Sequence, residues 1–140
     1  MAKFAKIIQE NNENFLIKKF IRLFRRKITD KGKSRFSFVL TGGKSPIKLY
    51  KRLAKNNKIP WKKIDFFIGD ERYVKENSKY SNIWMCKKYL LNKIKILDRQ
   101  IYKISTNQNS LKKDLQNYEQ RIKRYFLNKK VTFDLTLLGI

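Results

Sequence analysis

Two polar segments, each directly after an apolar segment, carry side chains that could bind an anion. The first is Thr41-Gly42-Gly43-Lys44-Ser45, which follows the apolar residues 38–40. Glycines let the backbone turn tightly and approach a ligand, and the lysine and the two hydroxyls add hydrogen-bond donors. Ser45 as N-cap and Pro46 at the first helical position predict a helix whose positive dipole end points the same way. These features predict a phosphate pocket without Walker A spacing, although an ordinary strand-to-helix turn explains them equally well.

The second polar segment is Asp70-Glu71-Arg72, which follows Gly69 and the apolar residues 64–68. Asp70 could accept hydrogen bonds from sugar hydroxyls or orient a base. Arg72 could hold a phosphate or a carboxylate in forked geometry. The alternative is a solvated loop with a local Asp–Arg ion pair, which contributes little to stability.

The composition limits the chemistry and the partners. The 140 residues include 35 Lys and Arg against 11 Asp and Glu, for a net charge of +24, and no His. Such charge suits a polyanionic partner, but the lysines are spread along the whole chain, which favours compositional bias. The single cysteine, Cys86, fits a reducing compartment and a buried structural thiol. No apolar run approaches a membrane span and no signal peptide is visible, so we expect a cytoplasmic protein.

Helical and strand patterns alternate along the chain. Apolar residues at helical spacing predict helices over 11–28, 45–55, 81–92 and 110–128. Asn11, Asn12 or Asn14 could cap the first helix, Ser81 or Asn82 the third, and Gly32 suits the turn after the first. Short apolar runs predict strands over 4–8, 35–40, 64–68, 101–104 and 133–140.

This alternation predicts a single α/β domain over 1–140: a layered, mostly parallel, Rossmann-like sheet with helices on both faces. Ligands of such sheets bind beyond the carboxyl ends of the strands, where both polar segments would lie. The last predicted strand reaches Ile140 with no loop after it. We therefore expect a sheet that is incomplete at the C-terminus, in a truncated sequence.

Several motifs in this order resemble the 6-phosphogluconolactonases of the glucosamine/galactosamine-6-phosphate isomerase superfamily. They are TGGKSPIKLY from Thr41, Trp61 before the strand that ends in Gly69-Asp70-Glu71-Arg72, Ser81-Asn82-Ile83-Trp84-Met85, and FDLTLLGI from Phe133. The resemblance covers about residues 36–140. Gly-Asp-Glu-Arg is the specific element, since the related glucosamine-6-phosphate deaminases carry a different acidic motif there.

The resemblance implies hydrolysis of 6-phosphoglucono-δ-lactone to 6-phosphogluconate, in the pentose phosphate pathway, without a metal or organic cofactor. By this resemblance Asp70 and Arg72 are the predicted catalytic residues. Asp70 would orient the base or a sugar hydroxyl, and Arg72 would bind phosphate or ring oxygens. The predicted substrate-binding and phosphate-binding residues are Thr41, Gly42, Gly43, Lys44, Ser45 and Asn82. Asn82 either supports the Gly-Asp-Glu-Arg loop or caps a helix.

The chain departs from the family pattern after Gly139-Ile140. Family members continue into Gly-x-Asp-Gly-His, whose histidine is taken as the base that activates water. We therefore expect the chain to be the N-terminal part of a longer lactonase domain and to lack activity by itself. The alternatives are a related sugar-phosphate isomerase or deaminase, a non-catalytic sugar-phosphate binder, or, in a different class, a basic nucleic-acid-binding protein. We expect neither a membrane partner nor a specific nucleic acid.

Overall fold

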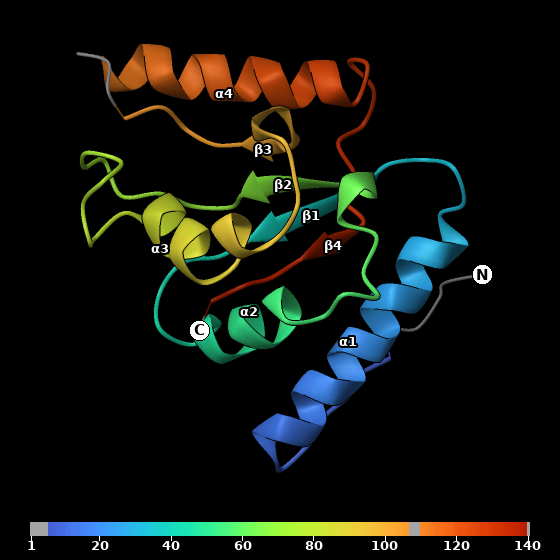
Figure 1. Ribbon diagram of the computed structural model, residues 1–140. Helices are drawn as coiled ribbons and strands as arrows, with labels where there is room; N and C mark the ends of the chain where they lie inside the picture. Colours follow the sequence, from blue (N-terminus) through green and yellow to red (C-terminus); the bar gives the residue numbers. More distant parts are fainter. Residues whose placement is uncertain (1–5, 107–109, 140) are drawn as a thin grey trace. The chain divides into compact units, whose positions relative to one another are not determined.

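The computed structural model describes residues 6–106 and 110–139, which form helices and strands in alternation (Figure 1). The chain divides into two compact units, Met1–Gly32 and Lys33–Ile140. The first unit contains helix α1 (Glu13–Asp30), and the second contains the sheet and the remaining helices. The prediction of one domain over 1–140 therefore stays a prediction.

Helix α1 begins where its asparagines predict. Among the three candidate caps, Asn12 is the N-cap, because its side chain accepts hydrogen bonds from the backbone of Asn14 and Phe15. After the helix, Gly32 has φ +63°, the left-handed conformation that glycine adopts at helix ends. The strand predicted over 4–8 is wrong for residues 6–8, which have no regular structure. Phe4 and Ala5 lie outside the described residues.

The second unit is built on a four-stranded parallel sheet of order β3-β2-β1-β4. The central strands are β1 (Phe36–Leu40) and β2 (Ile64–Ile68), every residue of which is buried. The edge strands are β3 (Ile101–Tyr102) and β4 (Leu135–Thr136). Strands buried on both faces explain the unbroken apolar runs in the sequence. This arrangement confirms the predicted layered α/β fold.

Helices cover both faces of this sheet. Phe67 of β2 contacts Tyr125 at the end of α4 (Leu111–Tyr125), which places α4 over the face that carries Phe67. Helices α2 (Ile47–Ala54) and α3 (Asn82–Tyr89) follow β1 and β2 on the opposite face (Figure 1). Right-handed crossovers require this division, because β1, β2 and β3 advance in one direction while β4 returns to the other side of β1.

Several predicted elements are shorter than the patterns suggest. Helix α3 ends at Tyr89, and residues 91–93 form a separate 3₁₀ turn. The strand predicted over 101–104 has two residues, and so does the one predicted over 133–140, where Ile140 lies outside the described residues. In α4, Leu111 and Leu115 are about half exposed, whereas Asp114 is fully buried.

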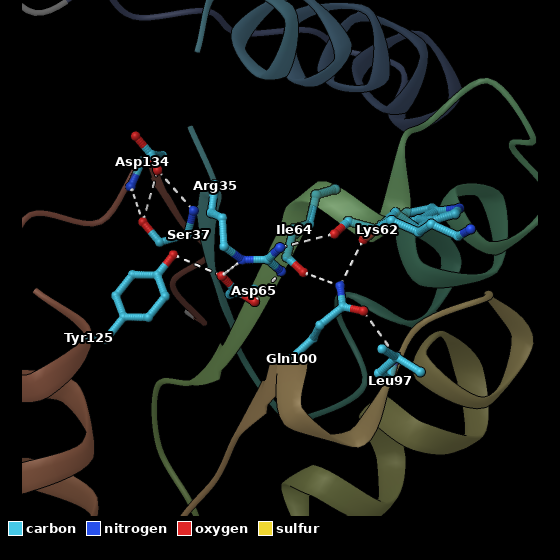
Figure 2. A network of polar contacts seen from close by, with 10 residues as sticks. Arg35, Ser37, Lys62, Ile64, Asp65, Leu97, Gln100, Tyr125 and Asp134 are labelled. Atoms are coloured by element: carbon cyan, nitrogen blue, oxygen red, sulfur yellow. Dashed lines mark hydrogen bonds and ion pairs between the residues drawn. The ribbon is translucent and has the colours of Figure 1, made fainter. Parts of the chain in front are cut away.

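Polar contacts close the edge of the sheet where the strands begin (Figure 2). The Asp65 carboxylate accepts from Nε and Nη2 of Arg35 and from the Tyr125 hydroxyl, the last at 3.0 Å. The Asp134 carboxylate accepts from the Ser37 backbone N–H at 2.8 Å and from its hydroxyl at 2.9 Å. We call this side the amino edge and the opposite side, where the strands end, the carboxyl edge.

Candidate functional site

The candidate site lies at the carboxyl edge of the sheet, beside the point where the strand order reverses. From β1 the chain continues through α2 to β2 on one side, whereas β4 pairs with β1 on the other side. Crevices at such reversal points are the usual ligand sites of open α/β sheets. The segment after β1, Thr41–Ser45, and the segment after β2, Gly69–Tyr80, both lie at this edge.

Three of the predicted site residues meet through hydrogen bonds. The amide nitrogen of Asn82 donates to a carboxylate oxygen of Asp70 and to the Asp70 backbone carbonyl, each at 2.9 Å. The other carboxylate oxygen of Asp70 accepts from the Thr41 hydroxyl at 3.5 Å. Thr41 and Asn82 are buried, while Asp70 is exposed. Asn82 thus supports the loop after β2, and the cap of α3 is Ser81, which accepts from the Trp84 N–H at 3.3 Å.

Glycines let the loop after β1 approach this group. A Cβ added at Gly42 would lie 2.0 Å from the Asn82 side-chain oxygen, so only glycine fits while Asn82 keeps its place. Gly43 has φ +82°, in the left-handed region that side-chain-bearing residues rarely adopt. Both glycines therefore have a physical reason: Gly42 lets the backbone approach Asn82 closely, and Gly43 allows the turn.

The remaining predicted residues do not join this hydrogen-bonded group. Gly43, Lys44 and Ser45 are exposed after β1, and Arg72 is exposed on the neighbouring loop. Ser45 is not the helix cap. Helix α2 begins at Ile47, whose N–H donates to the Lys44 carbonyl at 3.2 Å, so residues 44–47 form a turn that delays the helix.

Sequence reasoning missed the role of Glu71. One of its carboxylate oxygens accepts from the backbone N–H of Asn82 at 2.6 Å, and the other from that of Ile83 at 2.9 Å. The same carboxylate accepts from the Ser81 hydroxyl and from the Arg72 N–H. It therefore caps α3, whose own first turn contains no acidic residue. No local pattern in the sequence signals this cap, because Glu71 lies 11 and 12 positions before the residues whose N–H groups it accepts from.

Two buried side chains, those of Tyr50 and Cys86, contact the backbone of Thr41. The Tyr50 hydroxyl of α2 donates to the Thr41 carbonyl at 2.7 Å and accepts from its N–H at 3.1 Å. Burial raises the pKa of Tyr50 far above its ordinary value, at which the hydroxyl is already protonated at neutral pH. The Cys86 thiol also lies 3.7 Å from the same carbonyl. Burial raises the pKa of Cys86 to about 12, which confirms the predicted buried structural thiol.

A cavity of about 330 Å³ opens beside Thr41 and Asp70 under α4. Its walls come from the ends of three strands and from α4, which contributes Tyr118 and Ile122. The Tyr118 hydroxyl donates to the Ile68 carbonyl at 2.8 Å, at the last residue of β2. Of the predicted site residues, Thr41 and Asp70 line this hollow, and most of its other walls are apolar.

Two further findings concern only the described ranges 6–106 and 110–139. Within them, no three His, Cys, Asp or Glu side chains are grouped closely enough to hold a metal ion. None of the helices found there has the length and apolar character that crossing a membrane would take.

Comparison with known proteins identifies the family. Residues 10–140 match the family described as glucosamine-6-phosphate isomerases/6-phosphogluconolactonase, and the chain therefore belongs to it. A 6-phosphogluconolactonase of Thermotoga maritima is 31% identical over 134 residues, which cover 96% of this chain and 57% of the relative. One from Nostoc is 34% identical over 113 residues, covering 79% and 47% of the two chains. The resemblance stated from the motifs is thereby confirmed.

Solved structures agree with this assignment. The crystal structure of the Thermotoga maritima 6-phosphogluconolactonase has a TM-score of 0.80 at 28% identity, over 95% of this chain and 57% of that one. A 6-phosphogluconolactonase from Plasmodium vivax has a TM-score of 0.73 at 30% identity, over 91% and 44% of the two chains. A monomeric glucosamine-6-phosphate deaminase shares the fold, with a TM-score of 0.75 at 17% identity. The chain spans about half the length of the curated relatives it matches.

Proposed function

We propose that this protein hydrolyses 6-phosphoglucono-δ-lactone to 6-phosphogluconate. The observation that carries the proposal is the Thr41–Asp70–Asn82 group at the carboxyl edge, flanked by the exposed cations Lys44 and Arg72. A phosphorylated sugar needs cations for its phosphate and fixed polar groups for its hydroxyls. Membership of the family and the names of the relatives support the lactone as the substrate.

The reaction adds water to an ester carbonyl and breaks the ring C–O bond. Water attacks the carbonyl carbon, the carbonyl oxygen becomes an oxyanion, and the ring oxygen leaves with a proton. In this proposal Arg72 and Lys44 hold the phosphate, so that the carbonyl lies above the end of β1. The backbone of the 41–45 loop adds hydrogen-bond donors. No residue of this histidine-free sequence is assigned the removal of the water proton.

Asp70 has an orienting role in this proposal. Its carboxylate already accepts from Thr41 and Asn82, which fixes its position at the rim of the cavity. A carboxylate held in this way can accept from a sugar hydroxyl or from the N–H of a neighbouring base. Asn82 and Thr41 then act through Asp70 rather than on the substrate.

The test uses the protein encoded by the complete open reading frame that contains this sequence. Lactone hydrolysis is measured as kcat/KM, and binding of the product 6-phosphogluconate is measured by calorimetry. We expect Arg72→Ala and Asp70→Asn each to lower kcat/KM by roughly tenfold or more, as loss of a charge-assisted contact does. The matched control is Arg99→Ala, which removes an exposed arginine at the amino edge. Wild-type turnover in both site variants would refute the assignment.

The same assays separate the remaining candidates. A non-catalytic binder would bind 6-phosphogluconate without hydrolysing the lactone, and a deaminase would release ammonia from glucosamine 6-phosphate. A nucleic-acid-binding protein would be retained on DNA-cellulose at physiological salt, with a steep salt dependence. We also propose a cytoplasmic location, which the single buried thiol of Cys86 supports.

A further inference from the structure

The loop that carries Arg72 is tied to the helices on both of its sides. We call residues Gly69–Tyr80 the arginine loop. On one side, Glu71 caps α3 through the backbone of Asn82 and Ile83. Further along, the Glu76 carboxylate pairs with Lys87 of α3 at 2.5 Å and also with Lys103. These contacts hold both ends of the segment from Glu71 to Glu76.

Tyr73 forms the tie to the other layer of the molecule. Its hydroxyl donates to the Asp114 carboxylate of α4 at 3.0 Å. Asp114 is fully buried, and its second oxygen has no hydrogen-bond partner among the described residues. A buried carboxylate with so few partners depends strongly on each one, so the Tyr73 hydroxyl is held firmly.

The charge distribution also singles out this loop. Asp70, Glu71 and Glu76 lie within it and Asp114 contacts it, so this region uses four of the chain's 11 acidic residues. Desolvation and the Asp114 carboxylate raise the pKa of Tyr73 above its ordinary value, at which the hydroxyl is already protonated at neutral pH. In a chain of net charge +24, carboxylates gather around a loop whose exposed arginine is Arg72.

We propose that Tyr73, held by Asp114, is a positioning residue that orients Arg72 toward the phosphate of the sugar. The inference rests on the proposed function. Arg72 lies between Glu71, which is fixed to α3, and Tyr73, which is fixed to α4. With both neighbours anchored, the backbone at Arg72 has little freedom, and the guanidinium loses less entropy when it binds a phosphate.

The inference predicts that Tyr73 affects binding only through Arg72. In the protein of the complete reading frame, Tyr73→Phe removes one hydroxyl and leaves the ring. We expect its Kd for 6-phosphogluconate to rise roughly threefold to tenfold, the range of one lost hydrogen bond. The matched control is Tyr80→Phe, the same change at a tyrosine of the same loop that is 62% exposed. We expect the control to bind within about twofold of wild type.

A second background distinguishes positioning from a general loss of structure. When Arg72→Ala is already present, Tyr73→Phe should change the Kd by less than about twofold, because the residue through which it acts is gone. Its effect on thermal stability should be the same in both backgrounds. A structural role alone would weaken binding equally with and without Arg72.

The possible failures are distinguishable. If Arg72→Ala leaves the Kd for 6-phosphogluconate unchanged, the assignment of Arg72 in the proposed function is wrong. If Arg72→Ala weakens binding but Tyr73→Phe does not, the positioning role is overturned while the proposed function stands. Equal losses from Tyr73→Phe in both backgrounds overturn it as well.

Discussion

The two edges of the sheet use similar residue types for different purposes. At the amino edge, Arg35 forms an ion pair with Asp65 (Figure 2). The Asp65 side chain is nearly inaccessible and also accepts a hydrogen bond from Tyr125. At the carboxyl edge, Asp70 bonds to neutral partners, and the cation Arg72 stays exposed. An acid, an arginine and a hydroxyl near a strand end therefore do not by themselves mark a ligand site. The two edges differ in what holds the carboxylate: Arg35 neutralises Asp65, whereas the uncharged Thr41 and Asn82 hold Asp70.

The amide side chains make the same contrast. Gln100, at the amino edge, donates to the carbonyls of Trp61 and Ile64 and accepts from the Leu97 N–H, which ties the backbone around 61–64 to that around 97–100. Asn82, at the carboxyl edge, donates to a side chain that faces a cavity. The amino edge is therefore expected to govern stability, and the carboxyl edge both stability and binding.

The largest effect is expected from Gly42→Ala, which should damage both properties of the carboxyl edge. Its Cβ would overlap the Asn82 side chain, displacing it from Asp70. We expect a loss of about 3 kcal/mol in the free energy of unfolding, from overpacking and lost hydrogen bonds, with at least roughly tenfold weaker 6-phosphogluconate binding. Urea unfolding and calorimetry measure the two effects.

The control for this prediction is Asn82→Ala, which removes the atoms that the new Cβ would meet. In that background, Gly42→Ala should cost less than about 1 kcal/mol, because the overlap is gone. An undiminished cost there would show that Gly42 is needed for another reason.

A smaller effect, confined to stability, is expected from Asp65→Asn at the amino edge. The change leaves Arg35 and the Tyr125 hydroxyl without their charged acceptor. Since Arg35 is 48% exposed and can be hydrated, we expect a loss of about 2 kcal/mol rather than the larger cost of a fully buried pair.

The binding of 6-phosphogluconate should stay within about twofold of wild type in Asp65→Asn, since the altered residue lies at the opposite edge. Glu119→Gln, which removes an exposed ion pair with Lys123, serves as the control and should cost less than about 0.5 kcal/mol. A large loss of binding in Asp65→Asn would contradict the separation of the two edges.

The smallest effect concerns the anchor at Glu76 and appears as a pH dependence. Partial burial opposes its ionisation, but hydrogen bonds and charge from Lys103 and Lys87 hold its pKa below the usual value. A lowered folded-state pKa gives stability that is present above the ordinary glutamate pKa and is lost as pH falls through the folded-state pKa. Glu76→Gln should therefore lose less stability than wild type between about pH 5 and about pH 3. Urea unfolding at several pH values checks this, and parallel curves would contradict it.

Local sequence patterns were sufficient to predict the two central strands of the sheet. The apolar runs at 35–40 and 64–68 became β1 and β2, because strands buried on both faces leave an unbroken signal. The edge strands were overestimated, since each has only two residues in regular strand pairing. Asp114 was missed as a buried residue because its environment depends on Tyr73, which lies 41 positions earlier.

The candidate site was predictable in position but only partly in its contacts. Parallel strands bring their carboxyl ends to one edge, which is why Thr41, Asp70 and Asn82 could be expected together. The cap that Glu71 supplies to α3 spans 11 and 12 positions, beyond the reach of any local pattern. The prediction of Ser45 as the helix cap was wrong because residues 44–47 form a turn and the helix begins only at Ile47. Long-range polar contacts are the part that a single sequence does not encode locally.

The pairing of β4 with β1 has a consequence for the nascent chain. Ser37 meets Asp134 across 97 positions, so one edge of β1 acquires its neighbour only when nearly all of these residues have been synthesised. At a translation rate of about 5–20 residues per second, that edge waits on the order of 5–20 s. During this interval that edge of the apolar strand is open to pairing with other chains.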